Sequence, residues 1–381
     1  MGRLERCHSI ADLRRLALRR LPWMMREFLE GGSDDEWSLR ENRRAFSRYA
    51  LIPRALTNVS HIDTSTTVLG QRVAWPVLLA PTGASRMYHA EGELGVARAA
   101  ARTDTLYGLS LYSTVPLEAV ASATTAPKMF QLFTGPGRER GLALLDRARA
   151  AGYGALCLTV DTAAPPNKER DYRTGLATGR FPARSVASAV AHPRWLYGLV
   201  RSGFPRLANL DVGVAEARDH QWREAAQLDW DLAKRLRDRW PGPFALKGVL
   251  RVEDARRAAA AGFDAIIVSN HGGRQLDGVP APIELVADFV DAVGDELEVL
   301  VDSGFRRGTD VVKALALGAR AVLVGRAYLY GLAAGGEAGV VRAIEILREE
   351  LLRDLTLLGA ASVASLDRSF VRRQDGTVRP G

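Results

Sequence analysis

Three segments of the chain repeat one pattern, in which an alanine-rich stretch stops at a glycine and a short apolar run begins two residues later. The repeats lie at residues 151–158, 261–268 and 317–324. Glycine ends a helix because it tolerates the left-handed conformation of the cap. An uninterrupted apolar run suits a strand that is buried on both faces of a parallel sheet. The pattern therefore predicts helix–strand units that alternate along the chain.

Five further apolar runs are candidate strands, at 77–80, 106–109, 128–132, 244–247 and 298–301. With the strands that begin at Ala155, Ala265 and Ala321 they make eight, and helical segments such as 92–102, 142–150, 252–260 and 309–317 separate most of them. Eight alternating units over about 250 residues predict an α/β fold of the (β/α)8 TIM-barrel type. A doubly wound sheet is the weaker alternative, because no G-x-G-x-x-G turn follows the first strand.

Two segments fall outside the eight units, and we interpret both as parts of one domain that spans residues 1–381. Residues 1–60 are predicted to form a helical extension at the N-terminus. Residues 165–225 form a long insertion after the fourth strand, in which Arg194 and Arg201 alternate with Trp195 and Tyr197. A long loop at a barrel mouth is typical of a lid. Attachment of this insertion to a membrane surface is the less favoured alternative.

Charge and cysteine content exclude several classes of function. The balance of 52 basic against 44 acidic residues gives a net charge of +8, but no basic run is interleaved with aromatic residues. We therefore expect no nucleic-acid partner. Cys7 and Cys157 are far apart and lack C-x-x-C spacing, so we expect neither a disulfide framework nor a metal site, and we favour a reducing cytoplasm. No window approaches the roughly 18 apolar residues of a membrane span.

In a (β/α)8 barrel the residues at the carboxyl ends of the strands carry function. The sixth strand is the most informative, because the apolar run 265–268 leads directly into Ser-Asn-His-Gly-Gly-Arg-Gln-Leu-Asp-Gly at 269–278. His271, a proton acceptor, thereby emerges beside Arg274, a bidentate anion binder. The other strand ends hold small hydroxyls, an amide, a lysine and, after the last two strands, glycines and arginines where this fold usually binds phosphate.

This series of strand ends resembles that of the FMN-dependent 2-hydroxy-acid oxidases and dehydrogenases, such as glycolate oxidase, lactate oxidase and mandelate dehydrogenase. The resemblance covers nearly the whole chain. It implies that FMN is the cofactor and that its ring is surrounded by Pro81, Thr82, Gly83, Ser110, Gln131, Thr159, Lys247 and Ser269. It further implies that the ribityl chain and phosphate are held by Asp302, Gly304, Arg306, Gly325 and Arg326. Arg306 and Arg307 cannot both face inward, so one of them is expected in solvent.

The resemblance also implies oxidation of an L-2-hydroxy acid to the 2-keto acid. His271 would accept the substrate hydroxyl proton while the Cα hydrogen passes to flavin N5 as hydride; a carbanion route, in which His271 takes the Cα proton, uses the same residues and stays open. Asp161 would bond the other imidazole nitrogen, and Arg274 would fork onto the substrate carboxylate. Lys247 would stabilise the negative charge that grows on the ring. The electron acceptor would be oxygen or another carrier, and the assembly a homotetramer.

The sequence departs from the family at the substrate site, where Phe28 and Phe133 stand at the positions of two tyrosines. Each lost hydroxyl removes a neutral donor worth roughly 0.5–1.5 kcal/mol to a carboxylate or hydroxyl. Tyr112 matches a pocket-lining position and could supply one hydroxyl, while Lys168 and Arg173 could add cationic contacts. We therefore expect a substrate that is larger and less polar than glycolate or lactate.

Gly83 bears on the electron acceptor, because several fast oxidases of the family carry alanine at this position. Glycine there favours an acceptor other than oxygen. Loss of both tyrosines also leaves room for a second enzymatic reading, the oxidation of an amine or of a specialised biosynthetic intermediate, with or without decarboxylation. A non-enzymatic flavin-binding scaffold is the third reading, and the retained base and anion binder argue against it.

Overall fold

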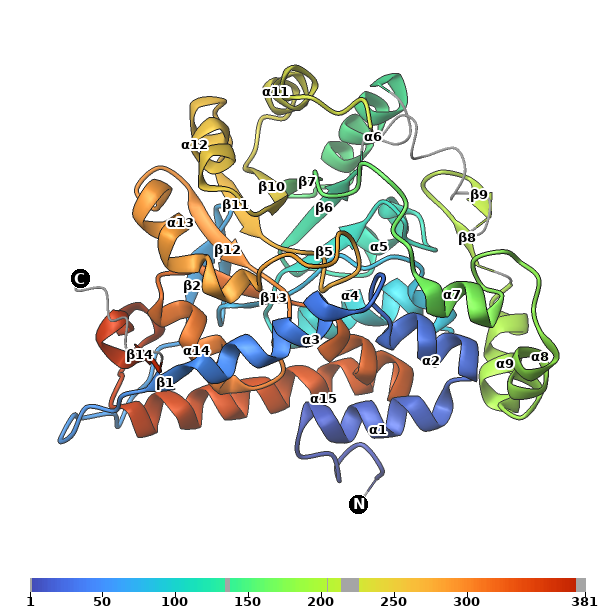
Figure 1. The fold of residues 1–381 in the computed structure, drawn as a ribbon, viewed down its shortest axis with the longest axis horizontal. Helices are drawn as coiled ribbons and strands as arrows, with labels where there is room; N and C mark the ends of the chain where they lie inside the picture. Colours follow the sequence, from blue (N-terminus) through green and yellow to red (C-terminus); the bar gives the residue numbers. More distant parts are fainter. Residues whose placement is uncertain (1, 134–137, 204, 214–225, 375–381) are drawn as a thin grey trace.

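A closed barrel of eight parallel strands forms the centre of the computed structural model, which describes residues 2–133, 138–203, 205–213 and 226–374 (Figure 1). The strands follow one another around the barrel in chain order. They are β4 (Val77–Leu79), β5 (Tyr107–Ser110), β6 (Lys128–Leu132), β7 (Ala155–Thr159), β10 (Phe244–Val249), β11 (Ala265–Val268), β12 (Glu298–Val301) and β13 (Ala321–Val324). The predicted (β/α)8 barrel is thus confirmed.

Helices surround the barrel and connect its strands (Figure 1). The connecting helices are α4 (Gly92–Arg102), α5 (Leu117–Ser122), α6 (Arg138–Ala150), α11 (Trp230–Arg239), α12 (Val252–Ala260), α13 (Val286–Val293) and α14 (Gly308–Ala316). The last strand leads into α15 (Arg326–Leu358), whose backbone leaves the helical conformation at Gly335 and Gly336. Ala-rich faces let these helices approach the sheet closely, as the fully buried Ala97 and Ala258 show.

Alternate residues of the strands fill the barrel, as the two-residue period of a strand requires. Leu78, Met129 and Ile267 belong to one buried cluster inside it, whereas the neighbours Val77 and Leu79 belong to the larger cluster under the helices. The hairpin of β2 (Thr66–Val68) and β3 (Gln71–Val73) adds Val68, Leu69 and Val73 to the inner cluster. The Leu69 N–H donates to Glu298 at the start of β12 (2.8 Å), so the hairpin covers the amino end of the barrel.

The N-terminal extension crosses the opposite end of the barrel. It contains α1 (Ile10–Arg20), α2 (Trp23–Glu30), α3 (Trp37–Arg44), the short 3-10 helix η1 (Ala45–Arg48) and β1 (Tyr49–Leu51), which pairs with β14 (Val371–Arg373). Helix α1 packs along α15. Asp277 accepts hydrogen bonds from the N–H groups of Trp37 and Ser38, which joins the start of α3 to the loop after β11.

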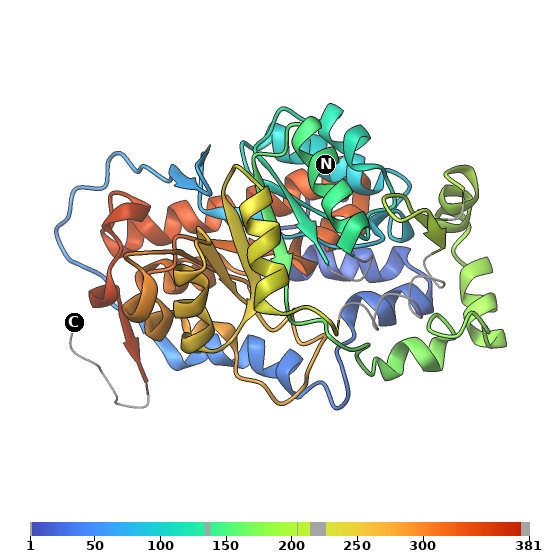
Figure 2. The same ribbon diagram turned by 90° about the horizontal axis from the view of Figure 1, so that it is seen from above.

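The described part of the insertion after β7 contains three helices and a small hairpin. These are α7 (Glu169–Thr174), α8 (Ala183–Val190), α9 (Pro193–Arg201), β8 (Arg206–Leu207) and β9 (Val212–Gly213); residues 204 and 214–225 of the predicted insertion lie outside the described ranges. Helices α8 and α9 protrude at one end of the molecule in both views (Figures 1 and 2). No residue of α9 is buried. No helix in the described ranges is long and apolar enough to cross a membrane.

Three strand bounds differ from the predicted ones, and at β10 the difference coincides with an irregular backbone. Strand β10, predicted to end at Lys247, continues to Val249 with a bulge between Lys247 and Val249. Strand β4 ends at Leu79, one residue early, and β5 is shifted by one residue to Tyr107–Ser110. The hairpins β2–β3 and β8–β9 were not predicted, because their strands are too short to show a hydrophobic period.

Candidate active site

A cavity of about 340 Å³ opens at the carboxyl ends of the barrel strands. Most of the residues that the sequence singles out line it together. They are Phe28, Pro81, Thr82, Gly83, Ser110, Tyr112, Gln131, Phe133, Lys168, Lys247, His271, Arg274, Asp302, Gly304, Arg306, Gly325 and Arg326. These residues are spread along the sequence from Phe28 to Arg326, and the barrel brings them together at the carboxyl ends of its strands.

Three of the predicted residues do not line the cavity but bond to residues that do. Thr159 accepts a hydrogen bond from the Gln131 amide (2.6 Å), and Ser269 accepts one from the Lys247 ammonium (2.8 Å). Asp161 lies behind His271. Arg173 does not line the cavity either; it pairs with Glu169 on the exposed face of α7, so the predicted cationic contact from Arg173 is wrong.

His271 is held by a carboxylate on one side of its ring. The Nδ1 atom lies 3.2 Å from both oxygens of Asp161, which arrives from the end of β7. A carboxylate accepts hydrogen bonds, so Nδ1 carries the proton in this pair and Nε2 is the basic nitrogen. Nε2 has no partner among the described residues. His271 also has a left-handed backbone (φ +58°), a conformation that costs a residue with a side chain about 1–2 kcal/mol.

Asp161 stays ionised in this arrangement. Burial alone would raise its pKa, but the His271 imidazole and the Lys247 ammonium bring the pKa of Asp161 below its ordinary value. The negative charge lies 3.2 Å from Nδ1 and stabilises the imidazolium that forms when His271 accepts a proton. Geometry and charge together make Nε2 of His271 a general base.

Lys247 forms a second buried charged pair. Its ammonium lies 2.8 Å from the Asp302 carboxylate, and only 4% of the Lys247 side chain is exposed. Burial would lower the pKa of Lys247, but the charges of Asp302 and Asp161 raise it, so the lysine remains protonated. The Asp302 carboxylate holds the Lys247 ammonium in the wall of the cavity, where the ammonium favours negative charge on a bound ring.

Arg274 is fixed by backbone carbonyls of the N-terminal extension. Its Nη1 atom donates to the carbonyl oxygens of Phe28 and Gly31, at 2.8 Å each, and its guanidinium lies over the Phe28 ring, 5.1 Å from the centroid. The Nε and Nη2 atoms have no partner in the described part of the chain. A rigid guanidinium with one free edge can bind a carboxylate through two parallel hydrogen bonds.

Arg326 and Arg306 add two more cations to the same cavity. Arg326 donates to the carbonyl oxygens of Leu29, Gly31 and Gly272, and burial together with the charge of Arg274 lowers its pKa to about 10. Neither of them, nor Arg274, forms an ion pair with a carboxylate among the described residues. Three partly buried cations that face one cavity without a paired carboxylate favour an anionic ligand there, since it would offset their mutual repulsion. They sit beside Gly325, at the N-terminus of α15, where a phosphate is favoured.

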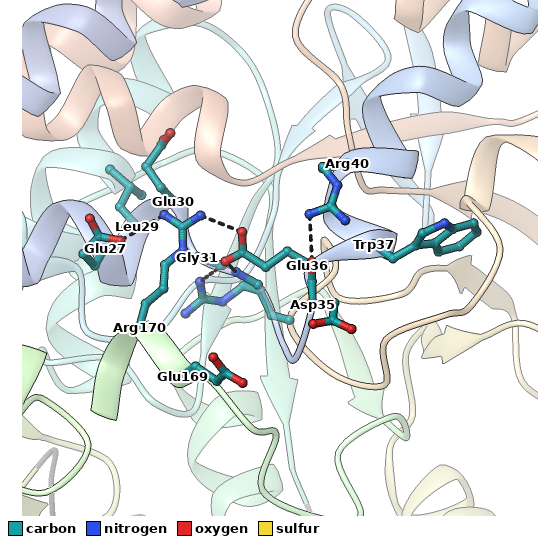
Figure 3. A network of polar contacts seen from close by, with 12 residues as sticks. Glu27, Leu29, Glu30, Gly31, Asp35, Glu36, Trp37, Arg40, Glu169 and Arg170 are labelled. Atoms are coloured by element: carbon teal, nitrogen blue, oxygen red, sulfur yellow. Dashed lines mark hydrogen bonds and ion pairs between the residues drawn. The ribbon is translucent and has the colours of Figure 1, made fainter. Parts of the chain in front are cut away.

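A network of polar contacts holds the carbonyls that anchor these arginines (Figure 3). Arg170 of α7 pairs with Glu27 (2.9 Å) and with Glu36 (2.6 Å), on either side of Gly31. The Gly32 N–H donates to Glu36 as well (2.9 Å). The insertion and the N-terminal extension thereby fix the segment that positions Arg274 and Arg326.

Aromatic side chains form the remaining wall. Tyr112 and Phe133 lie with their ring centroids 4.5 Å apart, and Phe28 stacks on Tyr88 at 6.1 Å. Sequence reasoning missed several residues that line the cavity, namely Met87, Tyr88, Asp171, Leu207 and Ser303. Met87 and Tyr88 follow the first strand end and could have been found by extending that loop; Leu207 comes from the β8–β9 hairpin and carries no signal in the sequence.

Arg306 and Arg307 point in different directions. Arg306 lines the cavity and lies over the Tyr330 ring, 5.5 Å from the centroid, whereas Arg307 is half exposed and pairs with Glu350 (2.7 Å). Arg306 thus faces the cavity, whereas Arg307 faces the surface.

Comparison with known proteins assigns the chain. Residues 17–373 match the model of the FMN-dependent dehydrogenase family. The chain belongs to this family. It is 41% identical to the L-lactate dehydrogenase of Caulobacter vibrioides over 95% of this chain and 97% of that protein. It is 38% identical to the (S)-mandelate dehydrogenase of Pseudomonas putida over 97% of this chain and 95% of that protein.

The fold of this FMN-dependent dehydrogenase also matches solved structures. A crystal structure of the monotopic membrane protein (S)-mandelate dehydrogenase superposes with a TM-score of 0.92, at 38% identity, over 97% of this chain and 100% of that one. The family predicted from the strand ends is therefore confirmed, as are FMN as the cofactor and the oxidation of 2-hydroxy acids as the class of reaction. The donor set described above fits FMN, with cations for the phosphate and amide and hydroxyl groups along the wall.

Proposed function

We propose that this enzyme oxidises an L-2-hydroxy acid with an aromatic or large apolar side chain to the corresponding 2-keto acid. The observation that carries the proposal is the His271–Asp161 pair beside the free edge of Arg274, in a cavity whose wall is aromatic. Phe28 and Phe133 offer apolar surface where a small polar substrate would need donors. The names of the relatives include both a mandelate dehydrogenase and an L-lactate dehydrogenase, so the choice of a large side chain rests on the aromatic wall.

The residues divide the chemistry between them. Arg274 binds the substrate carboxylate and so fixes the hydroxyl-bearing carbon near His271. Nε2 of His271 takes the hydroxyl proton, and Asp161 stabilises the imidazolium that forms. Bound FMN supplies the acceptor for the two electrons and the hydrogen that leave the substrate carbon. Arg306 and Arg326 would hold the FMN phosphate, Asp302 would hold the ribityl chain, and Lys247 would lie at the ring.

Anaerobic mixing of the FMN-loaded enzyme with a panel of acids tests the proposal. The flavin absorbance should bleach faster with aryl or long-chain 2-hydroxy acids than with lactate or glycolate, and L-enantiomers should be preferred. Matching 2-amino acids test the alternative reaction. If only the amino compounds bleach the flavin, the proposal is wrong.

A variant tests the base directly. His271→Gln should retain FMN and bind a 2-keto acid, while flavin reduction falls by about 10²-fold or more, the usual contribution of a general base. Undiminished reduction would contradict the assignment of His271. Arg307→Gln is the matched control, because Arg307 lies outside the cavity on the adjoining surface.

We propose that the insertion at 165–225 acts as a lid and that Lys168, at the start of α7, adds a cation to the substrate site. Lys168 and Leu207 of the β8–β9 hairpin both come from the insertion, and both line the cavity. Lys168→Met should raise the KM for the acid more than it lowers kcat. An unchanged KM would contradict the role.

The same insertion supports a peripheral attachment to a membrane surface, within the cytoplasmic location that the two free cysteines favour. Large apolar side chains are exposed on α8 and α9, with Val190 and Tyr197 both 65% exposed and Val200 62% exposed. Arg194 and Arg201 flank them on α9, as in helices that lie in a lipid interface. Flotation with vesicles of anionic lipid tests this, and Tyr197→Ser with Val200→Ser should reduce the bound fraction.

Two further parts of the proposal concern the acceptor and the assembly. Glycine at position 83 favours an acceptor other than oxygen, so the reduced enzyme should be reoxidised faster by a quinone or dye than by dissolved oxygen.

The proposed homotetramer should appear at four times the mass of one chain in light scattering. Faster reoxidation by oxygen, or another mass, would contradict the respective part.

A further inference from the structure

Tyr88 occupies a position in the cavity to which neither the sequence nor the family pattern directed attention. It follows the short 3-10 helix η2 (Ser85–Met87) in the loop between β4 and α4. Its side chain lines the cavity and is only 5% exposed. Its ring stacks on Phe28, with centroids 6.1 Å apart and planes inclined by 20°.

Phe28 places Tyr88 close to the carboxylate-binding arginine. The guanidinium of Arg274 lies over the same Phe28 ring, and Arg274 also bonds the Phe28 carbonyl. Burial raises the pKa of Tyr88, and the positive charge of Arg274 acts against this rise, so the phenol feels that charge. The phenol therefore stays neutral and keeps its proton, as a hydrogen-bond donor must.

The hydroxyl of Tyr88 has no hydrogen-bond partner within the described ranges. Of the other tyrosines in or beside the cavity, Tyr328 donates its hydroxyl to the Ala80 carbonyl (2.9 Å) and Tyr330 donates to Glu30 (2.6 Å). The hydroxyl of Tyr112, which lines the cavity, has no partner within the described ranges either. Buried polar groups normally find a partner. A nearly buried phenol in the wall of a ligand cavity, left without one by the protein, therefore points to the ligand.

Tyr112, which the sequence suggested as the replacement donor, lies elsewhere in the wall. It packs on Phe133, and burial alone accounts for the raised pKa of Tyr112. It packs neither on Phe28 nor over Arg274, whereas Tyr88 shares the Phe28 ring with that arginine.

We propose that the Tyr88 hydroxyl donates a hydrogen bond to the substrate carboxylate alongside Arg274. The residue would thus replace, from the β4–α4 loop, the hydroxyl that is missing from Phe28 on α2. The inference rests on the proposed function, because it concerns the same carboxylate. Tyr88 would then contribute to specificity. Its hydroxyl would bind the substrate carboxylate, while the Phe28 ring on which it stacks keeps the adjoining wall apolar.

Ligand binding tests the proposal without turnover. Benzoylformate and acetophenone share a phenyl ketone, and only the first carries a carboxylate; each is titrated into the FMN-loaded enzyme and followed by the change in flavin absorbance. Tyr88→Phe keeps the ring and should raise the Kd of benzoylformate about tenfold, the effect of one hydrogen bond to a charged group. The Kd of acetophenone should stay the same.

Two other variants separate the hydroxyl from general effects. Tyr107→Phe removes a buried hydroxyl that is also unpartnered but lies outside the cavity, and it should change neither Kd. Phe28→Tyr in the Tyr88→Phe background should recover part of the lost affinity, because it returns a hydroxyl beside Arg274.

The outcomes distinguish this inference from the proposed function. If wild-type enzyme binds benzoylformate and Tyr88→Phe binds it equally well, the inference is wrong and the proposed function stands. The inference is also wrong if Tyr88→Phe weakens both ligands alike, or if Tyr112→Phe rather than Tyr88→Phe shows the loss that depends on the carboxylate. If the wild-type enzyme retains FMN but binds no 2-keto acid, the proposed function fails first.

Discussion

The backbone of Gly248 lies directly against the carboxylate of Asp161, so that a Cβ on Gly248 would be 2.5 Å from the Asp161 Cγ. Gly248 is the residue at the bulge in β10, and its φ is +101°. Asp161 can therefore reach His271 only because the neighbouring strand carries no side chain at this point. The bulge extends β10 beyond the predicted end at Lys247, and it also leaves the space that Asp161 occupies beside His271.

Gly248→Ala should displace Asp161 and separate it from His271. Without the carboxylate the imidazolium is less stable, so the rate of flavin reduction should fall about 10²-fold or more while FMN stays bound. Stopped-flow reduction of the FMN-loaded variant measures this. Gly262→Ala is the matched control, because Gly262 also has a positive φ (+80°) but its Cβ would meet nothing within 4 Å. Equal loss of rate in both variants would show that backbone strain alone is responsible.

Gly83 faces a similar restriction from the aromatic wall. A Cβ there would lie 2.9 Å from the Tyr112 Cβ and 3.2 Å from the Tyr112 carbonyl oxygen. Gly83→Ala should therefore shift Tyr112, raise the KM for an aromatic acid and cost about 1–3 kcal/mol of stability through overpacking. Steady-state kinetics and chemical denaturation check both effects. Gly198→Ala, whose Cβ would only touch Ala90 at 3.6 Å, should leave the KM unchanged.

A pair of buried amides connects the N-terminal extension to the catalytic loop. Asn42 of α3 donates to Asn270 (2.8 Å), and Asn270 donates back to Asn42 (2.7 Å). Asn42→Ala leaves the Asn270 amide unpaired and should lower the free energy of unfolding by about 1–3 kcal/mol. Because Asn270 precedes His271, flavin reduction should slow as well.

Another buried amide serves as the control for Asn42. Asn209 bonds Leu117 and Ser113, and none of these three residues lines the cavity. Asn209→Ala should therefore lower stability with little effect on the rate of reduction in the folded fraction. Thermal unfolding and single-turnover reduction, measured on both variants, separate the two effects. If the rate of flavin reduction falls in both variants in proportion to the lost free energy of unfolding, a specific role for Asn42 is contradicted.

The barrel and most of its site could be predicted because each strand end carries its own local signal. The apolar run before Ser269, and the polar residues directly after it, place His271 and Arg274 at the mouth without any knowledge of long-range contacts. The same reasoning finds Lys247 and Asp302 separately. It does not show that they form one ion pair, since a pairing between strands depends on the closed sheet.

The site residues that the sequence did not predict lie in loops or act through backbone atoms, and neither produces a periodic pattern of residue types. Tyr88 lies in a loop, and only its stacking on Phe28 reveals its relation to Arg274. The carbonyl oxygen of Gly31, which accepts hydrogen bonds from both Arg274 and Arg326, is a backbone group and cannot be recognised from residue type. The insertion could be recognised by length, but the position of Leu207 within the wall could not.

A buried carboxyl far from the cavity makes the stability depend on pH. Burial raises the pKa of Asp354 from an ordinary value of 3.8 to about 6, and Asp354 is 7% exposed. Because the folded state binds this proton more tightly than the unfolded state, the free energy of unfolding falls as pH rises from about 4 to about 6. Above that window the cost is complete, at most about 3 kcal/mol for a shift of roughly two pKa units.

Asp354→Asn should remove this dependence, since the amide cannot ionise. The variant should be more stable than the wild type at pH 8, and the difference should shrink toward pH 4. Urea denaturation at the two pH values measures it. Asp238→Asn, on the exposed face of α11 in a pair with Lys234, should show no such trend. A difference that is the same at both pH values would mean that the substitution acts through packing, and that Asp354 does not titrate in this range.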